Sequence, residues 1–390
     1  MSRILMAWEL GGNLGHVVTL LAVARELRAR GRDVVFALRD LAHAGLIARD
    51  KFAFFPAPVP VQGRRPHAYP SYAALLAGAM FPSAKAALVG ALAWRSILRA
   101  TRPHLLIADH APMALLAARG LKLRTATLGV PFSIPVAGAA LPVFLKGHAD
   151  APAEEERLLK RLNAALNALR APRLEVVSDL YRTDATMVRT LPELDCFGPR
   201  PPASYVPPEA ADASEAAPDW PGEKSQKALV YLQAGAWVRP VLETLARRGV
   251  STIAYIGGLD KQRSKPVVRP GLHVSNVPFK ASVLVRQADI VVCHGGHGMV
   301  TAAVLAGKPL VVLPSHLEQA LTAQRVEKLG IGFIASGKAD PAPLARCWQG
   351  VEPGAPAHAR AAKLAARYPT QPGAGTLAEV VSRVERLLQA

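Results

Sequence analysis

The sequence predicts an α/β protein of two Rossmann-like domains, each built on a parallel sheet, that face each other across a cleft. The chain has 390 residues, which is long for a single hydrophobic core. Each half opens with an apolar run, a glycine loop and a helical stretch, the pattern of parallel strands joined by a helix. We therefore expect one domain over 1–200, a proline-rich linker over 201–226, a second domain over 227–374 and a terminal helix over 375–390.

The first half has a sharply patterned start. SRILMAW (2–8) is a short apolar run, and GGNLG (11–15) is a glycine loop. Residues 16–31 then place apolar side chains at helical spacing and stop at Gly31, before a second apolar run at 33–38. Further along the chain, the pattern predicts one long helical region over 72–101 and strands over 103–112 and 124–131.

The second half repeats the alternation of strands and helices. Its predicted strands cover 227–235, 251–258, 271–278, 288–296 and 307–314. Its predicted helices cover 239–249 and 323–332, and residues 375–390 form an amphipathic terminal helix. Ligands of such sheets bind beyond the carboxyl ends of the strands, so we expect the site in the cleft between the domains.

The composition describes a globular chain with an unusual charge. It is 51% hydrophobic, and its formal net charge is +18. The basic residues are dispersed and no basic stripe alternates with aromatics, so we expect no nucleic-acid partner. The charge leaves open an anionic membrane surface, an acidic substrate or an arginine-rich proteome.

Cysteine use and hydropathy predict the compartment. Three scattered cysteines are too few for a disulfide framework, which fits a reducing cytoplasm. No signal peptide is recognised, and the longest apolar stretch, 126–147, is interrupted by Pro131, Pro135 and Pro142. We expect a cytoplasmic protein that can contact the inner membrane face at its periphery.

The run CHGGHG at 293–298 lies between an apolar run and an alanine-rich helix. The first amides of a helix have no intrahelical partners, and glycines allow an anion to approach them closely. A phosphate or diphosphate is therefore the expected ligand. The chain contains no GxxxxGK[ST] motif, and GGHG does not have the GxGxxG spacing of dinucleotide-binding turns.

Two segments resemble family 1 glycosyltransferases, which have the GT-B fold and use nucleotide-diphosphate sugars. One segment begins with H-G-G-x-G at 294–298, which is followed after eight residues by Gly307. The motif x-P-L-V-V-L-P then covers 308–314, and Glu318–Gln319 follow it. The other is G-x-L-G-H at 12–16 with the helix that follows. The resemblance implies an inverting hexosyltransferase with an N-terminal acceptor-binding domain and a C-terminal domain that binds the nucleotide sugar. It also implies that the terminal helix packs back on the N-terminal domain.

The resemblance assigns two catalytic residues. His16 matches the family's base, which deprotonates the acceptor hydroxyl, and a histidine at a helix start can accept a proton near neutral pH. Asp109, at a strand end, matches the carboxylate that orients this base. A helix-capping role remains the alternative for each residue.

The resemblance also assigns the donor site, with UDP- or dTDP-sugars as donors and a hydrophobic hydroxyl compound as acceptor. No further cofactor is implied, and the Cys293, His294, His297 and His316 cluster lacks the spacing of a zinc site, so we expect no metal. The residues that match the donor-binding positions are Gly235, His294, Gly295, Gly296, Gly298, Met299, Glu318 and Gln319.

Three positions depart from the family pattern. Ala302 stands where the family has a ribose-binding glutamate, while Met299 and Ala236 replace hydroxyl residues near the phosphates. Each change removes about one hydrogen bond, worth roughly 0.5–1.5 kcal/mol. A changed nucleotide, a non-catalytic glycosyltransferase-like binding protein and a nucleotide-sugar 2-epimerase therefore remain alternatives.

Overall fold

The computed structural model describes residues 2–12, 14–60, 68–206, 217–222, 226–258, 270–337, 341–368 and 376–389. The chain divides into two compact units. The first consists of Met1–Arg189, Phe197–Val206 and Thr376–Ala390, and the second of Thr190–Cys196 and Pro207–Gly375. Residues 207–216 and 223–225, half of the predicted linker, lie outside the described residues.

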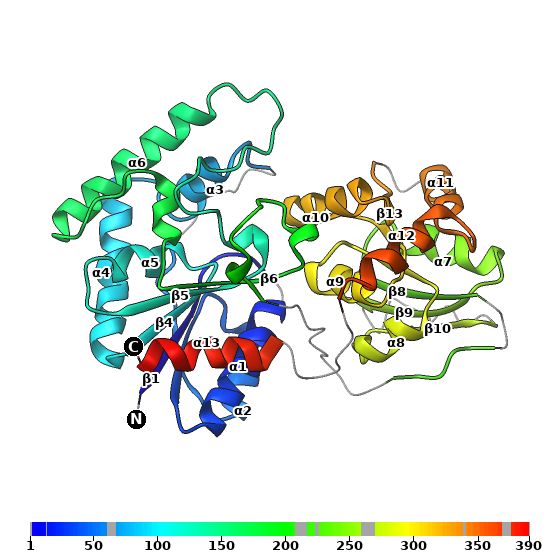
Figure 1. Cartoon of the computed structure of the whole chain (residues 1–390), viewed down its shortest axis with the longest axis horizontal. Helices are drawn as coiled ribbons and strands as arrows, with labels where there is room; N and C mark the ends of the chain where they lie inside the picture. Colours follow the sequence, from blue (N-terminus) through cyan, green and yellow to red (C-terminus); the bar gives the residue numbers. More distant parts are fainter. Residues whose placement is uncertain are drawn as a thin grey trace. The chain divides into compact units, whose positions relative to one another are not determined.

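The first unit is built on one parallel sheet. Over the described residues it has seven strands in the order β3-β2-β1-β4-β5-β6-β7. The strands are β1 (Arg3–Trp8), β2 (Asp33–Leu38), β3 (Ala53–Pro56), β4 (Leu105–Asp109), β5 (Arg124–Gly129), β6 (Ala185–Arg189) and β7 (Tyr205–Val206). The α-helices are α1 (Leu14–Ala29), α2 (Ala44–Arg49), α3 (Tyr72–Ala79), α4 (Ala84–Thr101), α5 (Pro112–Ala118), α6 (Ala151–Ala168) and α13 (Thr376–Gln389) (Figure 1).

The helical region predicted over 72–101 consists of two helices. α3 ends at Ala79, and α4 begins at Ala84. Pro82 lies between them, and a proline has no backbone N–H to continue a helix. Ser83 then caps α4, because its hydroxyl accepts a hydrogen bond from the Ala86 amide at 3.1 Å.

The C-terminal helix α13 is part of the first unit. Val380, Val381 and Val384 are buried in the same core as α1 and the strands β1 and β2. The Arg32 guanidinium, next to β2, pairs with the Glu385 carboxylate, with Nε 2.9 Å from Oε1. Figure 1 shows α13 in red beside α1 in blue.

The second unit has a parallel sheet with the same pattern of strand order. Over the described residues it has six strands in the order β10-β9-β8-β11-β12-β13. The strands are β8 (Lys227–Gln233), β9 (Ser251–Gly257), β10 (Leu272–Ser275), β11 (Ile290–Cys293), β12 (Leu310–Val312) and β13 (Gly332–Ile334). The α-helices are α7 (Val238–Arg247), α8 (Ala281–Gln287), α9 (His297–Leu305), α10 (Leu317–Lys328), α11 (Pro341–Val351) and α12 (Pro356–Ala365).

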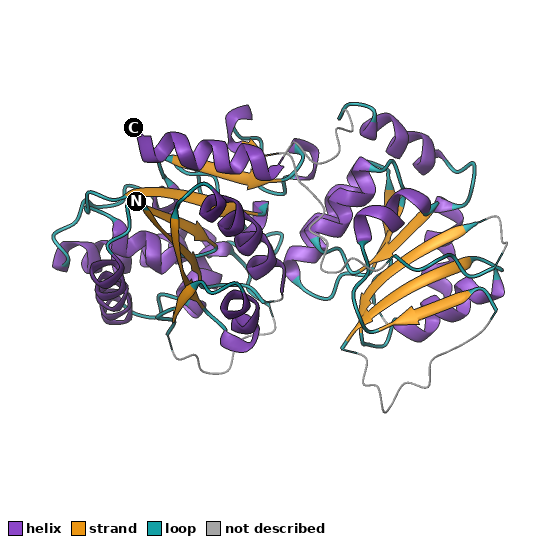
Figure 2. Ribbon diagram, turned by 90° about the horizontal axis from the view of Figure 1, so that it is seen from below, coloured by secondary structure: helices purple, strands orange, loops and turns teal. Residues whose placement is uncertain are grey.

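Helices cover both faces of the second sheet (Figure 2). Along β11, Val291 and Cys293 pack into one core, while Ile290 and Val292 pack into the other. Successive side chains of a strand point to opposite faces, so a strand buried on both sides has a continuous apolar sequence. This explains why the strands of this unit were visible as short apolar runs.

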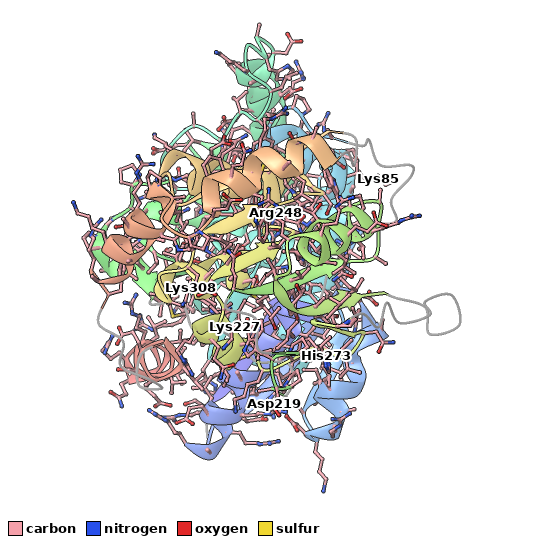
Figure 3. All side chains as sticks on the ribbon, turned by 90° about the vertical axis from the view of Figure 1, so that its right-hand side faces the viewer. Lys85, Asp219, Lys227, Arg248, His273 and Lys308 are labelled. Carbon is pink, nitrogen blue, oxygen red and sulfur yellow. The ribbon has the colours of Figure 1, made fainter. Side chains whose placement is uncertain are left out.

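The basic charge of the second unit comes from separate elements. Lys227 begins β8, Arg248 follows α7, and Lys308 precedes β12 (Figure 3).

Among the helices described, none is by itself long and apolar enough to cross a membrane, and α3 and α4 meet that test only as a pair bent by 70°.

We predict that the first unit depends on α13 for its stability. Val381→Asp should reduce the free energy of unfolding by about 3 kcal/mol or more, because it buries a carboxylate among apolar side chains. Ala378→Asp, on the exposed side of the same helix, should change it by less than about 0.5 kcal/mol. Thermal and denaturant unfolding measure both, and equal stability of the two variants would contradict the packing described.

Candidate active site

Both units carry their candidate site residues where the strand order of the sheet reverses. In the first unit this point lies between β1 and β4, and in the second between β8 and β11. The parallel register places Trp8 opposite Asp109 and Tyr231 opposite Cys293. Ligands of doubly wound sheets bind at such points, beyond the carboxyl ends of the strands.

The first unit joins the two residues predicted to be catalytic. The His16 Nδ1 lies 2.8 Å from the Asp109 Oδ2, although the residues are 93 positions apart. Their side chains are 15% and 4% exposed, so the pair is largely shielded from water. A carboxylate accepts hydrogen bonds, so Nδ1 carries the hydrogen and the lone pair of the neutral ring lies on Nε2.

The glycine loop and β1 hold the His16 ring in place. The Trp8 indole stacks on the ring, with centroids 5.3 Å apart and planes 20° apart, and its Nε1 donates to the Leu10 carbonyl at 2.7 Å. Gly11 has a φ of +87°, and a Cβ there would lie 2.6 Å from the His16 Nε2. Any larger residue at position 11 would therefore displace the imidazole.

Asp109 lies in an equally tight setting. A Cβ at Gly129, on the adjacent strand β5, would lie 3.1 Å from the Asp109 Oδ1 and 2.3 Å from the Ser133 Oγ. Among the described residues, this Oδ1 is buried without a hydrogen-bond partner. The next residue, His110, has a φ of +46° and points elsewhere, with Nε2 3.1 Å from the Tyr72 hydroxyl.

Burial keeps the His110 ring neutral. It lowers the pKa of His110 to about 3, and the charges of His16 and Arg39 act in the same direction. His110 is therefore no general base near neutral pH. The strand end presents one histidine–carboxylate pair for proton transfer and a second, neutral histidine inside an aromatic cluster.

Glu9 is a buried carboxyl that the sequence analysis did not single out. It follows β1, is 0% exposed, and accepts hydrogen bonds from the backbone amides of Met113 at 2.7 Å and Ala114 at 3.1 Å. It thus ties the strand before the glycine loop to the start of α5, just after Asp109. Its sequence signal was a charged residue between an apolar strand and glycines.

The second unit places His294 and the glycine turn at the start of α9. His294 follows β11, is half-buried, and has its Nδ1 3.1 Å from the Tyr231 carbonyl oxygen. Gly295 has a φ of +87°, and a Cβ there would lie 3.1 Å from the Gln319 carbonyl oxygen. A Cβ at Gly298 would have no atom within 4 Å, so the backbone at this position faces open space.

The remaining predicted donor residues lie around this turn. Gly235 is exposed after β8, and Met299 packs partly against the core. Glu318 is half-buried in the first turn of α10. Gln319 is buried, and its Oε1 accepts hydrogen bonds from the Ser315 amide at 2.9 Å and hydroxyl at 2.8 Å. The side-chain amide oxygen of Gln319 therefore holds the loop before α10 in place.

The histidines and the cysteine near the turn have separate surroundings. The Cys293 thiol is buried, which raises its pKa to about 12. The His297 Nε2 lies 2.9 Å from the Thr190 hydroxyl. In the part of the chain that the structure describes, no three His, Cys, Asp or Glu side chains are grouped closely enough to hold a metal ion.

We predict that Glu9 makes stability depend on pH. Burial raises its pKa from 4.5 to about 8, outweighing the backbone hydrogen bonds from Met113 and Ala114, which lower it. The folded chain then binds this proton more tightly than the unfolded chain does. The stability contribution of Glu9 therefore falls as the pH rises from about 4.5 to about 8.

Glu9→Gln should remove this slope, which one proton limits to about 1.4 kcal/mol per pH unit. Denaturant unfolding at several pH values measures it, and Glu26→Gln, in an exposed ion pair on α1, is the matched control. A Glu9→Gln variant with the same slope as the native chain would disprove the prediction.

Known proteins resemble this chain in sequence over limited segments. The family model described as "Erythromycin biosynthesis protein CIII-like, C-terminal domain" matches residues 258–387. A sterol 3-beta-glucosyltransferase of Leptosphaeria maculans is 29% identical over 122 residues, 28% of this chain and 8% of its own length. The NDP-glycosyltransferase YjiC of Bacillus subtilis is 47% identical over 49 residues, 13% of this chain and 12% of its own length. The chain thus spans a small part of these relatives.

The likeness in three dimensions covers nearly the whole chain. The spinosyn rhamnosyltransferase SpnG has a TM-score of 0.70 and 16% identity, over 99% of this chain and 100% of its own. At this identity the similarity establishes the fold. Together with the family model, it confirms the resemblance to family 1 glycosyltransferases and shows that the chain has the GT-B fold.

Proposed function

We propose that this protein is an inverting glycosyltransferase that moves a sugar from a nucleotide-diphosphate sugar to a hydroxyl of a hydrophobic acceptor. The observation that carries the proposal is the hydrogen bond of 2.8 Å between the His16 Nδ1 and the Asp109 Oδ2. A buried carboxylate fixes the tautomer of the ring and stabilises the imidazolium that forms when a general base accepts a proton. The glycosyltransferase relatives support the same class of reaction.

In the proposed mechanism His16 activates the acceptor. Its Nε2 accepts the hydroxyl proton while the acceptor oxygen forms a bond to the anomeric carbon. The bond from that carbon to the diphosphate oxygen breaks at the same time, and its electron pair leaves with the diphosphate. The Asp109 carboxylate stabilises the imidazolium that forms.

The turn at the start of α9 is proposed to bind the donor. The backbone near Gly298 faces open space, and the first amides of a helix attract a diphosphate through unpaired N–H groups and the helix dipole. These groups would stabilise the charge of the leaving diphosphate. We propose a UDP- or dTDP-sugar as donor, and the solved complex of SpnG with thymidine diphosphate supports the second of these.

An aromatic surface in the first unit supports a hydrophobic acceptor. The rings of Phe132, Phe144 and Phe197 lie within 6.5 Å of one another, and Phe144 and Phe197 are partly exposed. Val143 and Leu145, on either side of Phe144, are 50% and 58% exposed. SpnG has also been solved in complex with spinosyn aglycone. Tyr72 and Trp94 are fully buried and belong to the core of this unit.

Contact with an anionic membrane stays a prediction, as does a cytoplasmic location. One helix face supports the contact: Val89 and Leu92 on α4 are 55% and 46% exposed. Lys85 and Arg99 lie on the same face at helical spacing and are also exposed. Basic side chains around exposed apolar ones are suited to an anionic surface.

The binding-protein alternative rests on Ala236, Met299 and Ala302, where donor contacts of the family are missing. A panel of UDP-, GDP- and dTDP-sugars separates the alternatives. A transferase releases nucleotide diphosphate in the presence of acceptor, an epimerase produces a new nucleotide sugar, and a binding protein produces neither.

The proposed mechanism predicts the effect of removing His16, the general base. His16→Ala should lower turnover by about 10²–10⁴-fold, the usual contribution of a positioned base, and leave donor affinity nearly unchanged. Turnover is measured by nucleotide release and donor affinity by calorimetry. Near-native turnover in this variant would remove His16 from the mechanism.

The proposed donor site predicts the effect of a charge at Gly298, in the turn at the start of α9. Gly298→Asp should leave the unfolding temperature unchanged or raise it, since a carboxylate is favourable in the first turn of a helix. It should weaken binding of nucleotide diphosphates at least about tenfold, because the new carboxylate repels the phosphates. Gly298→Asn has the same shape without the charge and should weaken binding less. Equal affinity of the Asp variant and the native protein would place the anion elsewhere.

A further inference from the structure

The hydrogen bond of His294 fixes which ring nitrogen can face a ligand. The His294 Nδ1 lies 3.1 Å from the backbone oxygen of Tyr231, and a carbonyl oxygen can only accept. Nδ1 therefore carries a hydrogen whether the ring is neutral or charged. In the neutral ring the Nε2 has a lone pair and no hydrogen.

The Nε2 points toward the start of α9. A Cβ at Gly296, the N-cap residue of that helix, would lie 3.0 Å from the His294 Nε2. This is the end of the helix where the unpaired amides are located. A phosphate oxygen bound there also offers only lone pairs, so a neutral His294 would repel it, whereas an imidazolium would donate a hydrogen bond to it.

We propose that His294 binds the donor diphosphate only as an imidazolium, so that nucleotide binding takes up one proton from the solvent. This inference rests on the proposed function, because it requires the diphosphate to bind at the start of α9. It assigns His294 the role of a positive charge that is present in the complex and absent from the free protein.

The surroundings of His294 favour a neutral ring before the ligand arrives. Burial lowers its pKa, and the hydrogen bond to the Tyr231 carbonyl acts in the opposite direction. The Tyr231 ring is 6.4 Å away by centroids, and the Tyr255 ring packs against it with the planes tilted by 39°. Burial keeps the neighbouring Cys293 thiol protonated.

Two more histidines lie on the elements around the turn. The His297 Nε2 is bound to the Thr190 hydroxyl. His316, the N-cap residue of α10, has its pKa lowered by burial and by the charge of His294. Glu318 lies in the first turn of α10, the helix that packs against α9. Burial and the Tyr231 carbonyl act on the His294 pKa, and a bound diphosphate would add a negative charge that raises it.

The bound proton would also assist the departure of the diphosphate. Negative charge grows on the β-phosphate as its bond to the sugar breaks, and an imidazolium hydrogen-bonded to that phosphate offsets it. The proton stays with His294 during the transfer and returns to the solvent when the nucleotide dissociates. The acceptor proton is accounted for separately, because it passes to His16.

Calorimetric titration with thymidine diphosphate and with uridine diphosphate tests the inference. Titrations near pH 7.5, where the terminal phosphate is largely ionised, are run in buffers of different ionisation enthalpy. The observed heat plotted against that enthalpy should have a slope of roughly one proton taken up per nucleotide. Above neutral pH, affinity should fall by up to about tenfold per pH unit until the complex also loses its proton.

Two matched variants identify the group that takes up the proton. His294→Gln should still bind, more weakly, with a slope near zero, whereas His316→Gln should keep the native slope. A native slope of zero, or a slope that persists in His294→Gln, would overturn the inference and leave the proposed donor site intact. If neither thymidine diphosphate nor uridine diphosphate binds, the proposed function is overturned, and this inference with it.

Discussion

The parallel pairing of β1 with β4 is the constraint on which the candidate active site of the first unit depends. The register that places Trp8 opposite Asp109 brings two distant loops to one sheet edge. His16 can then reach Asp109 across 93 residues of chain. Trp8 stacks on His16, and the next residue, Glu9, binds the start of α5, so two consecutive residues at the end of β1 hold the pair in place. A shift of register would break all of them together.

The second unit uses the same arrangement to place a different chemistry. Its β8 and β11 are adjacent and parallel, so the carbonyl of Tyr231 meets the ring of His294 just beyond the strand end. In the first unit a carboxylate receives the Nδ1 hydrogen, and in the second a neutral carbonyl does. A carboxylate raises the basicity of its histidine, whereas a carbonyl in a buried site leaves the ring neutral until an anion arrives.

Close backbone approach explains why glycines recur at both edges. Gly11 leaves room for the His16 ring, Gly129 for the Asp109 carboxylate, and Gly295 for the backbone of α10. Gly298 differs, because a side chain there would meet no protein atom. This open space lies beside the unpaired amides at the start of α9, and the two together are the physical basis of the donor site proposed there.

The sequence by itself determined the fold class and most strand positions, since apolar periodicity and glycine turns are local signals. The candidate residues His16, Asp109 and His294 came from its resemblance to a known family. It did not determine the helix break at Pro82, or that Tyr72 and Trp94 belong to the core, because burial depends on neighbours distant in sequence. The pairing of Asp109 with His16 was implied by the resemblance, and the tertiary structure brings the two side chains within hydrogen-bonding distance. Only the tertiary structure gave Glu9 its amide partners and fixed the tautomer of His294. A hydrogen-bond partner is set by which strands lie side by side, and strand order is a property of the folded sheet.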